Sequence, residues 1–250
     1  MAEPEASPTS ATTGCVIVTG GAGEIGSRVA DLLRSRGRHV VTWDRSSSDE
    51  ATASHIRCDI TDTAQVGDAL RETEERAGRV DGLINSAGIG QFERFLDLPA
   101  DDFRRIIDVN LNGPVNCMRA VLPGMLQHGS GSIINITSIW STHAGPLRSA
   151  YIASKWGLLG VTKALMEEFR DSGIRMCAVS PGPVVTALSE RMIPAAERHL
   201  WMTPDEAAEV VVSVMSVSGD QFVGGEIQAY GRARPSGLWH ADLPRVVADT

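Results

Sequence analysis

Short apolar runs alternate with longer segments of helical periodicity along most of the chain. The apolar runs occupy residues 15–19, 39–43, 54–58, 80–84, 131–137 and 174–179, with a candidate seventh at 225–230. Helical periodicity follows in a segment ending near Gly37 and in residues 62–77, 100–127 and 149–171. Continuous apolar runs are typical of parallel strands covered on both faces. The pattern predicts an α/β fold with a doubly wound, mostly parallel sheet of about seven strands flanked by helices.

The ends of the chain lack this pattern. Residues 1–13 are rich in Ala, Pro, Ser and Thr and have no apolar face, so we expect a disordered tail. Residues 231–250 extend beyond the last candidate strand and are interpreted as a second tail. No repeat or interdomain linker separates them, and we predict a single domain over 14–230.

Composition narrows the class of partner. The net charge of −8 and the lack of a basic run argue against nucleic acid and membrane surfaces as partners and favour a small molecule. The four cysteines lack metal-ligand spacing, so no metal site is predicted and reduced thiols are expected. No apolar span reaches membrane-crossing length and no signal peptide is evident, which predicts a cytoplasmic protein.

A glycine-rich turn, Gly20–Gly26, directly follows the first predicted strand and opens a helix. Such a turn lets the backbone approach a pyrophosphate, which the helix N-terminus then stabilises. The alternative is that these glycines serve only the dihedral angles of a turn. Glu24 would be unfavourable beside a pyrophosphate, so we expect its side chain to point outward.

Asp44 stands at the end of the second predicted strand. A carboxylate there accepts hydrogen bonds from both ribose hydroxyls of an adenosine and repels a 2′-phosphate, which favours NAD(H) and leaves NADP(H) as the second choice. Arg45 could instead accommodate that phosphate. A third interpretation is that Asp44 and Arg45 merely solvate a loop.

Tyr151 and Lys155 are four residues apart in a predicted helix and share one face. General acid/base chemistry near neutral pH requires that the tyrosine pKa fall from about 10 toward about 7, and a neighbouring ammonium group favours the phenolate. A buried aromatic residue beside a lysine that reaches solvent is the competing interpretation. Pro114 predicts that the helix over 100–127 kinks or unwinds near Asn110.

Several of these motifs follow strands. In open α/β sheets ligands bind beyond the carboxyl ends of the strands, where Gly20–Gly26, Asp44, Asn85–Gly88 and Ser138 all fall. We therefore expect one crevice to collect them.

Taken together, these motifs resemble the short-chain dehydrogenases/reductases, in their compact single-domain branch, over about Cys15 to Ala229. The resemblance implies a Rossmann-type fold and hydride transfer between a nicotinamide cofactor and an alcohol or carbonyl carbon. It implies that Tyr151 is the acid/base, that Lys155 binds the nicotinamide ribose and tunes Tyr151, that Ser138 bonds the substrate oxygen, and that Asn110 holds a relay water. The residues then expected at the cofactor are Gly20, Gly23, Glu24, Ile25, Gly26, Asp44, Arg45, Asp59, Ile60, Asn85, Ala87, Gly88, Tyr151, Lys155, Pro181, Gly182, Val184 and Thr186.

The glycine spacing departs from the compact branch, because Glu24 occupies the middle glycine position. The spacing looks like that of the family's extended branch, which mostly modifies sugar nucleotides, but little chain follows Pro183 to form that branch's larger C-terminal domain. Two alternatives stay open: a nucleotide-sensing binding protein without turnover, and an epimerase or dehydratase acting on a nucleotide sugar.

The segment 187–203 resembles the family's substrate lid. The apolar residues of this lid are Leu188, Met192, Ile193, Leu200, Trp201 and Met202. Together with Phe92, Trp140 and Leu147 on the opposing walls of the pocket, they predict a hydrophobic or ring-bearing secondary alcohol or ketone as substrate. The alternative is that the lid packs on the body or on a neighbouring subunit. His143 lies in this wall region, where a solvated histidine is at least as plausible as a functional one.

The helices over 100–127 and 149–171, with Trp156 and Leu159, predict a homo-oligomer, a dimer or tetramer.

Overall fold

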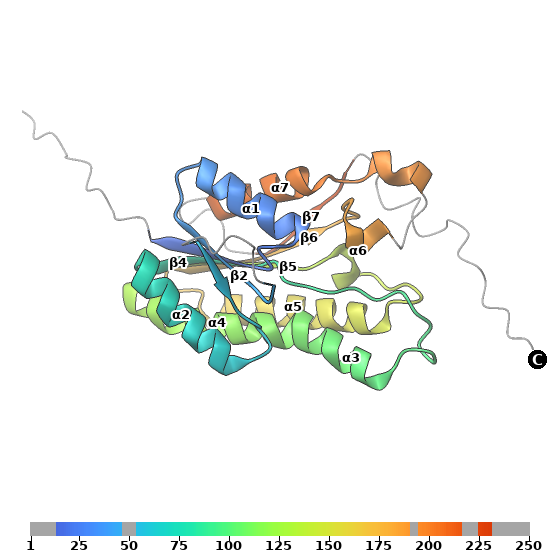
Figure 1. The fold of residues 1–250 in the computed structure, drawn as a ribbon, viewed down its shortest axis with the longest axis horizontal. Helices are drawn as coiled ribbons and strands as arrows, with labels where there is room; N and C mark the ends of the chain where they lie inside the picture. Colours follow the sequence, from blue (N-terminus) through green and yellow to red (C-terminus); the bar gives the residue numbers. More distant parts are fainter. Residues whose placement is uncertain (1–13, 47–53, 191–194, 217–224, 232–250) are drawn as a thin grey trace, which may run out of the picture.

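A seven-stranded parallel sheet forms the centre of the molecule (Figure 1). The computed structural model describes residues 14–46, 54–190, 195–216 and 225–231. The strand order is β3-β2-β1-β4-β5-β6-β7, and every pairing is parallel. The strands are β1 (Cys15–Thr19), β2 (Val40–Asp44), β3 (His55–Arg57), β4 (Val80–Asn85), β5 (Gly131–Ile136), β6 (Ile174–Pro181) and β7 (Gly225–Ala229). The predicted doubly wound α/β fold is confirmed.

Helices cover both faces of the sheet (Figure 1). One face carries α1 (Glu24–Ser35) and α7 (Pro204–Ser216), and the other carries α2 (Thr63–Ala77), α4 (Gly113–His128) and α5 (Ser149–Glu168). Each layer buries its own apolar cluster against the strands, with Leu33 and Val211 in the first and Met118 and Val121 in the second. Burial on both faces explains why the strands read as continuous apolar runs.

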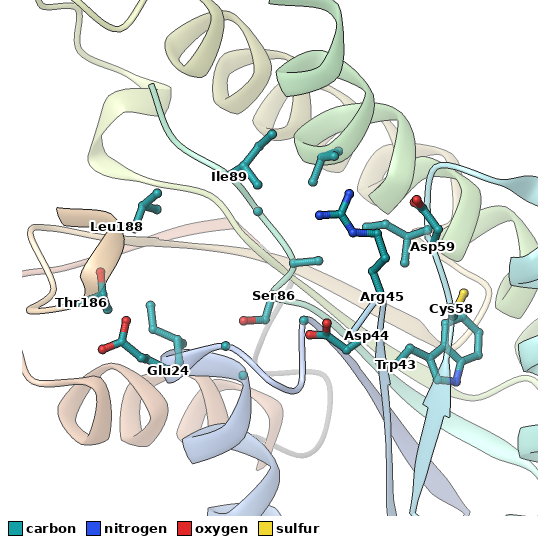
Figure 2. A pocket seen from close by; sticks show the side chains of 18 of the residues that line it. Glu24, Trp43, Asp44, Arg45, Cys58, Asp59, Ser86, Ile89, Thr186 and Leu188 are labelled. Carbon is teal, nitrogen blue, oxygen red and sulfur yellow. The ribbon is translucent and has the colours of Figure 1, made fainter. Parts of the chain in front are cut away.

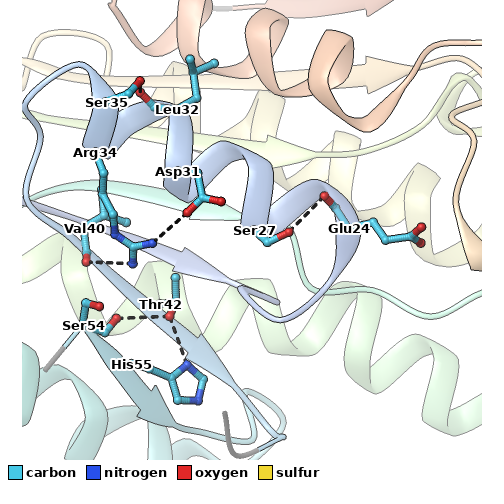
Figure 3. A network of polar contacts seen from close by, with 10 residues as sticks. All are labelled: Glu24, Ser27, Asp31, Leu32, Arg34, Ser35, Val40, Thr42, Ser54 and His55. Atoms are coloured by element: carbon cyan, nitrogen blue, oxygen red, sulfur yellow. Dashed lines mark hydrogen bonds and ion pairs between the residues drawn. The ribbon is translucent and has the colours of Figure 1, made fainter. Parts of the chain in front are cut away.

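Polar contacts fix the edge of the sheet that precedes Asp44 (Figure 3). Arg34 of α1 donates to the carbonyl of Val40 at 3.4 Å, and the Thr42 hydroxyl lies 3.1 Å from Nδ1 of His55 on β3. The same hydroxyl donates to the Ser54 carbonyl at 3.2 Å. These contacts tie β2 to its neighbours, so the carboxyl end of β2 is held in place beside the glycine turn.

The helix predicted over 100–127 is three segments. A π-helical turn, η1 (Asp108–Asn112), separates α3 (Ala100–Ile107) from α4, and Pro114 lies in the first turn of α4. Because proline has no backbone N–H to donate, the hydrogen-bond ladder shifts register immediately before it. The predicted unwinding near Asn110 is therefore present, and it places that side chain inside the protein.

Some predicted bounds change. The helix expected to reach residue 171 ends at Glu168, and β6 continues through Pro181. The candidate lid contains α6 (Ala187–Glu190) and a 3-10 turn, η3 (Ala195–Leu200). The predicted tails over 1–13 and 231–250 lie outside the described residues, apart from Gly231.

Candidate active site

The carboxyl ends of the strands border one cavity of about 310 Å³ (Figure 2). Of the predicted cofactor residues, those that line it are Gly20, Gly23, Glu24, Ile25, Gly26, Asp44, Arg45, Asp59, Ile60, Ala87, Gly88 and Thr186. The cavity collects the glycine turn, Asp44 and the residues after Asn85 as expected, whereas Ser138 is not among its lining residues. Its length runs from the glycine turn, past the end of β2, to the first residues of the lid.

The glycine turn packs too tightly for side chains at two positions. Gly20 has φ +67°, and a Cβ there would lie 2.7 Å from Cα of Ala87. A Cβ on Gly26 would lie 2.2 Å from the Gly20 carbonyl oxygen. The Thr19 hydroxyl accepts hydrogen bonds from the backbone N–H groups of Ser86 and Ala87, both at 3.2 Å. The turn after β1 and the loop after β4 are thus locked side by side as one wall.

Asp44 lies across the glycine turn. Its Oδ2 accepts from the backbone N–H of Ala22 at 3.0 Å, and its Oδ1 accepts from the Ser46 N–H at 3.0 Å and hydroxyl at 2.6 Å. These bonds orient the carboxylate at the cavity wall (Figure 2). Arg45 also lines the cavity, so the structure keeps both residues that bear on cofactor choice in contact with the same space.

Glu24 does not point away from the cavity as expected. Its side chain lines the wall, and its Oε2 accepts a hydrogen bond from the backbone N–H of Ala187 at 2.8 Å (Figure 2). Ala187 begins α6, whose free N–H groups favour an anion. The glutamate therefore links the glycine turn to the start of the lid.

Asn85 also departs from its predicted place. It is buried, and its Nδ2 donates to Oδ1 of Asn135 at 2.8 Å, so it joins β4 to β5 rather than lining the cavity. Asn135 in turn donates to the Thr162 hydroxyl of α5 at 2.8 Å. The residues after Asn85, beginning with Ser86, form the wall instead. The chain that follows β6 leads to Thr186. Three predicted cofactor residues on this path do not line the cavity: Pro181, the last residue of β6, and Gly182 and Val184 beyond it.

Ser138, Tyr151 and Lys155 lie close together near the loop that carries Gly88, although none of the three lines the cavity itself. Ser138 caps the short turn η2 (Ile139–Ser141), and its hydroxyl accepts from the Trp140 N–H at 3.2 Å. On α5, Nζ of Lys155 donates to the Ile136 carbonyl at 2.9 Å and lies 5.8 Å from the centroid of the Tyr151 ring. A Cβ on Gly88 would lie 3.7 Å from that ammonium group. Lys155 therefore lies close to both the cavity wall at Gly88 and the Tyr151 ring.

Burial controls the protonation of both α5 side chains. Burial raises the pKa of Tyr151 above its ordinary value, although a hydrogen bond with Ser138 and the charge of Arg148 act in the opposite direction. Burial lowers the pKa of Lys155 to about 8. In the protein alone, desolvation of the phenolate outweighs these stabilising contributions to the Tyr151 pKa. Depression of that pKa by Lys155 together with a positively charged nicotinamide ring stays a prediction for the cofactor complex.

The Asn110 side chain bonds to the loop after β4 and to α5. Its Oδ1 accepts from the Ile89 N–H at 2.8 Å, and its Nδ2 donates to the Ile89 carbonyl at 2.9 Å and to the Ser154 hydroxyl at 3.1 Å. Its role in holding a relay water stays a prediction. The side chain clamps the loop after β4 beside Lys155, which makes Asn110 a positioning residue.

The apolar lid packs mainly on the body. Trp201 and Met202 are buried, and Met202 joins a cluster with Val184, Ala207 and Ala229. Leu188 lines the cavity and is 43% exposed, whereas Met192 and Ile193 lie outside the described residues. The packing alternative therefore accounts for Trp201 and Met202, and the argument for an apolar substrate loses those two residues.

Sequence reasoning missed two residues that support the site. Gln91 is buried and accepts from the Ala150 N–H at 3.0 Å, and Ser154 donates to the Tyr151 carbonyl at 2.7 Å. Arg148, in the segment expected to wall the substrate pocket, is a buried cation beside Tyr151. Ser154 lies three residues from Tyr151, a spacing that brings helical residues together. That spacing was the available signal. Gln91 had none, because its partner is far away in sequence.

Within the described ranges, no group of three or more His, Cys, Asp or Glu residues is arranged to hold a metal ion. The same ranges contain no helix that is long and apolar enough to span a membrane. The four cysteines are free and buried, and burial raises the pKa of Cys15 and of Cys58 to about 12.

The parallel sheet and the glycine turn after β1 define a Rossmann-type α/β fold. The model of the short chain dehydrogenase family matches residues 14–197, and the chain belongs to this family.

Several known proteins are similar to this chain. The 2-dehydro-3-deoxy-L-rhamnonate dehydrogenase (NAD(+)) of Sphingomonas sp. (strain SKA58) is 37% identical over 186 residues, 71% of this chain and 75% of that protein. The D-beta-hydroxybutyrate dehydrogenase of Rhizobium meliloti (strain 1021) is 32% identical over 213 residues, 80% of this chain and 83% of that protein. Among solved structures, levodione reductase has a TM-score of 0.80 at 26% identity and covers 92% of this chain and 99% of its own.

Proposed function

We propose that this protein is a dehydrogenase/reductase that transfers hydride between a nicotinamide cofactor, preferentially NAD(H), and a secondary alcohol or its ketone. The observation that carries the proposal is the position of Lys155, which is buried close to Gly88 of the cavity wall and 5.8 Å from the centroid of the Tyr151 ring. Two relatives named as dehydrogenases, one of them for NAD(+), support the same reaction type.

The cavity fits a dinucleotide. Gly20 and Gly26 let the turn after β1 pack tightly against its own backbone and against Ala87, and this turn brings the cavity wall to the start of α1, where backbone N–H groups favour a pyrophosphate. Asp44 offers acceptor oxygens for ribose hydroxyls, and Gly88, a cavity residue without a side chain, lies close to the Lys155 ammonium group that would meet a second ribose. When bound there, the cofactor supplies the hydride acceptor or donor.

The chain's own residues manage the oxygen and its proton. In reduction, the Tyr151 hydroxyl donates a proton to the substrate oxygen, and the Ser138 hydroxyl donates a hydrogen bond to it; in oxidation, Tyr151 receives the proton. The raised pKa of Tyr151 keeps the phenol protonated near neutral pH, which suits proton donation. Asn110 and Ser154 hold Ile89 and the first turn of α5 in register for this step.

The test is to incubate the protein with NAD(H) or NADP(H) and a panel of secondary alcohols and ketones while following the absorbance of the reduced cofactor. Net, substrate-dependent cofactor turnover is the expected result. Conversion of a nucleotide sugar without net cofactor turnover would select the epimerase or dehydratase alternative. Tight cofactor binding with no conversion of any substrate class would select the binding protein.

A further inference from the structure

Arg148 is a buried cation at the entrance to α5. Only 6% of the residue is exposed, and it lies one helical turn before Tyr151, whose phenol feels the charge of its guanidinium group. Burial of a charge is unfavourable unless a counter-charge or hydrogen bonds replace water. The contacts around the guanidinium group therefore indicate which kind of ligand it can bind.

Two aromatic rings enclose the guanidinium group. Its central carbon lies 4.7 Å from the Trp140 ring centroid and 5.0 Å from the Phe92 ring centroid. Rings stacked on a guanidinium plane attract its charge and leave its edge open for hydrogen bonds. Phe92 and Trp140 are the residues expected to wall the substrate pocket, so the cation lies between those walls.

The hydrogen-bonding capacity of Arg148 is largely unused. Nη1 donates to the carbonyl of Pro146 at 3.1 Å, and the buried Nε has no partner. None of the ion pairs formed between described residues includes Arg148. The nearest acidic residue on the adjoining loop, Glu93, contacts this turn through its backbone N–H, while its side chain is exposed.

A strained backbone conformation lies next to the cluster formed by Phe92, Trp140 and Arg148. Leu147 has φ +66°, and it is the one non-glycine residue with a positive φ in the described ranges. Such strain persists where surrounding structure fixes it, often at ligand sites. Here the Leu147 carbonyl accepts from the Glu93 N–H at 3.0 Å, and Gln91 accepts from the Ala150 N–H at 3.0 Å. The loop carrying Phe92 is thus pinned to the turn carrying Arg148.

We propose that Arg148 binds a carboxylate or sulfonate group of the substrate, so that the reacting compound is an anionic secondary alcohol or its ketone. The inference rests on the proposed function, since it assigns the other end of the same substrate molecule. An oxyanion would pair with the open edge of the guanidinium group while the hydroxyl-bearing carbon faces Tyr151. This replaces the neutral, ring-bearing substrate expected from the lid.

The net charge of −8 disfavours an anionic substrate at long range, and a local cation such as Arg148 would offset this. The guanidinium group also carries specificity. A neutral analogue would leave the buried cation unpaired, and sites with a buried polar group strongly reject analogues that cannot satisfy it.

The first experiment compares hydroxy acids, with the carboxylate one, two or three carbons from the carbinol, against their uncharged primary amides and against hydroxyalkanesulfonates. We expect the Arg148→Met variant to lose about 10- to 100-fold more in kcat/KM for the anionic alcohols than for the amides, whose loss reports the effect of the missing charge on Tyr151 alone. Arg148→Lys should fall between, since it keeps the charge without the planar fork. Arg94→Met, which removes an exposed arginine paired with Asp97, is the control.

A role for Arg148 in packing alone predicts a different kinetic result. In that case Arg148→Met would lower kcat/KM for acids and amides in parallel, and the proposal would be overturned. Wild-type protein that prefers every amide to its acid would overturn it as well, while leaving the dehydrogenase function intact.

The second experiment measures binding without turnover. Calorimetric titration of NADH-loaded Tyr151→Phe protein should show binding of the acids or sulfonates but not of the amides, and adding Arg148→Met should abolish it. Anion binding that depends on Arg148, in a protein that turns over no alcohol, would support the anion site and refute the proposed function. Anion binding that survives loss of Arg148 would refute the site.

Discussion

Burial of Lys155 has a measurable consequence at the scale of a single residue. The ammonium group has one hydrogen bond to protein, from Nζ to the Ile136 carbonyl, and the pKa is lowered to about 8. The folded protein therefore binds fewer protons than the unfolded chain between about pH 8 and the ordinary lysine value of 10.5. By linkage, stability attributable to this residue rises with pH across that window.

We predict that the free energy of unfolding of the wild type, relative to Lys155→Met, increases by up to about 3 kcal/mol between pH 7.5 and pH 10.5. Urea unfolding of both proteins without cofactor provides the measurement, and the difference between them cancels the other titrating groups. A difference that is flat or falls with pH would show that Lys155 is not desolvated as described.

We predict that Asp44, also at the scale of a single residue, sets the preference for NAD(H) over NADP(H). Asp44→Asn keeps an acceptor for the Ala22 N–H but removes the charge. We expect its NADH affinity to fall by about 10-fold, because hydrogen bonds to a charged group are stronger, and its NADPH affinity to rise. Fluorescence titration with each reduced cofactor measures both. Wild-type protein that binds NADPH as tightly as NADH would contradict the assignment and point to Arg45.

The link between Glu24 and Ala187 belongs to the scale of elements, since it joins α1 to α6. Glu24→Gln preserves an acceptor oxygen, whereas Glu24→Ala removes it. Both variants should bind NAD about 5-fold more tightly, because a carboxylate facing the pyrophosphate cavity is lost. Only Glu24→Ala should also raise KM for the substrate. Equal KM values in the two variants would show that the hydrogen bond does not position the lid.

The elements follow from the sequence to different degrees. Apolar runs and Pro114 predicted the sheet and the unwound turn at Asn110, because both depend on local sequence. The pairing of Asn110 with Ile89, and of Asn85 with Asn135, depends on residues that only the folded sheet brings together. The raised pKa of Tyr151 in the protein alone could not be read from the sequence for a related reason, since desolvation depends on the whole surrounding volume.

At the scale of the whole molecule, we predict a dimer or tetramer formed through α4 and α5. Trp156 on α5 is 51% exposed and Leu126 on α4 is 42% exposed, which fits an uncovered subunit face. Leu159, expected on that face, is buried in the core. Trp156→Glu should shift the mass measured by light scattering at micromolar concentration toward monomer. A wild-type protein that is monomeric under those conditions would contradict the prediction.

The central claim is that the Tyr151 hydroxyl acts on the substrate oxygen while the glycine-turn cavity binds the cofactor independently. The most direct test is Tyr151→Phe, assayed for turnover of the best substrate and for NADH affinity by fluorescence titration. We predict that kcat falls by about 100- to 10,000-fold, as expected for loss of a general acid/base, while the NADH dissociation constant changes by less than about 3-fold. A phenylalanine variant that keeps most of its activity, or that loses NADH affinity in proportion to kcat, would contradict the account.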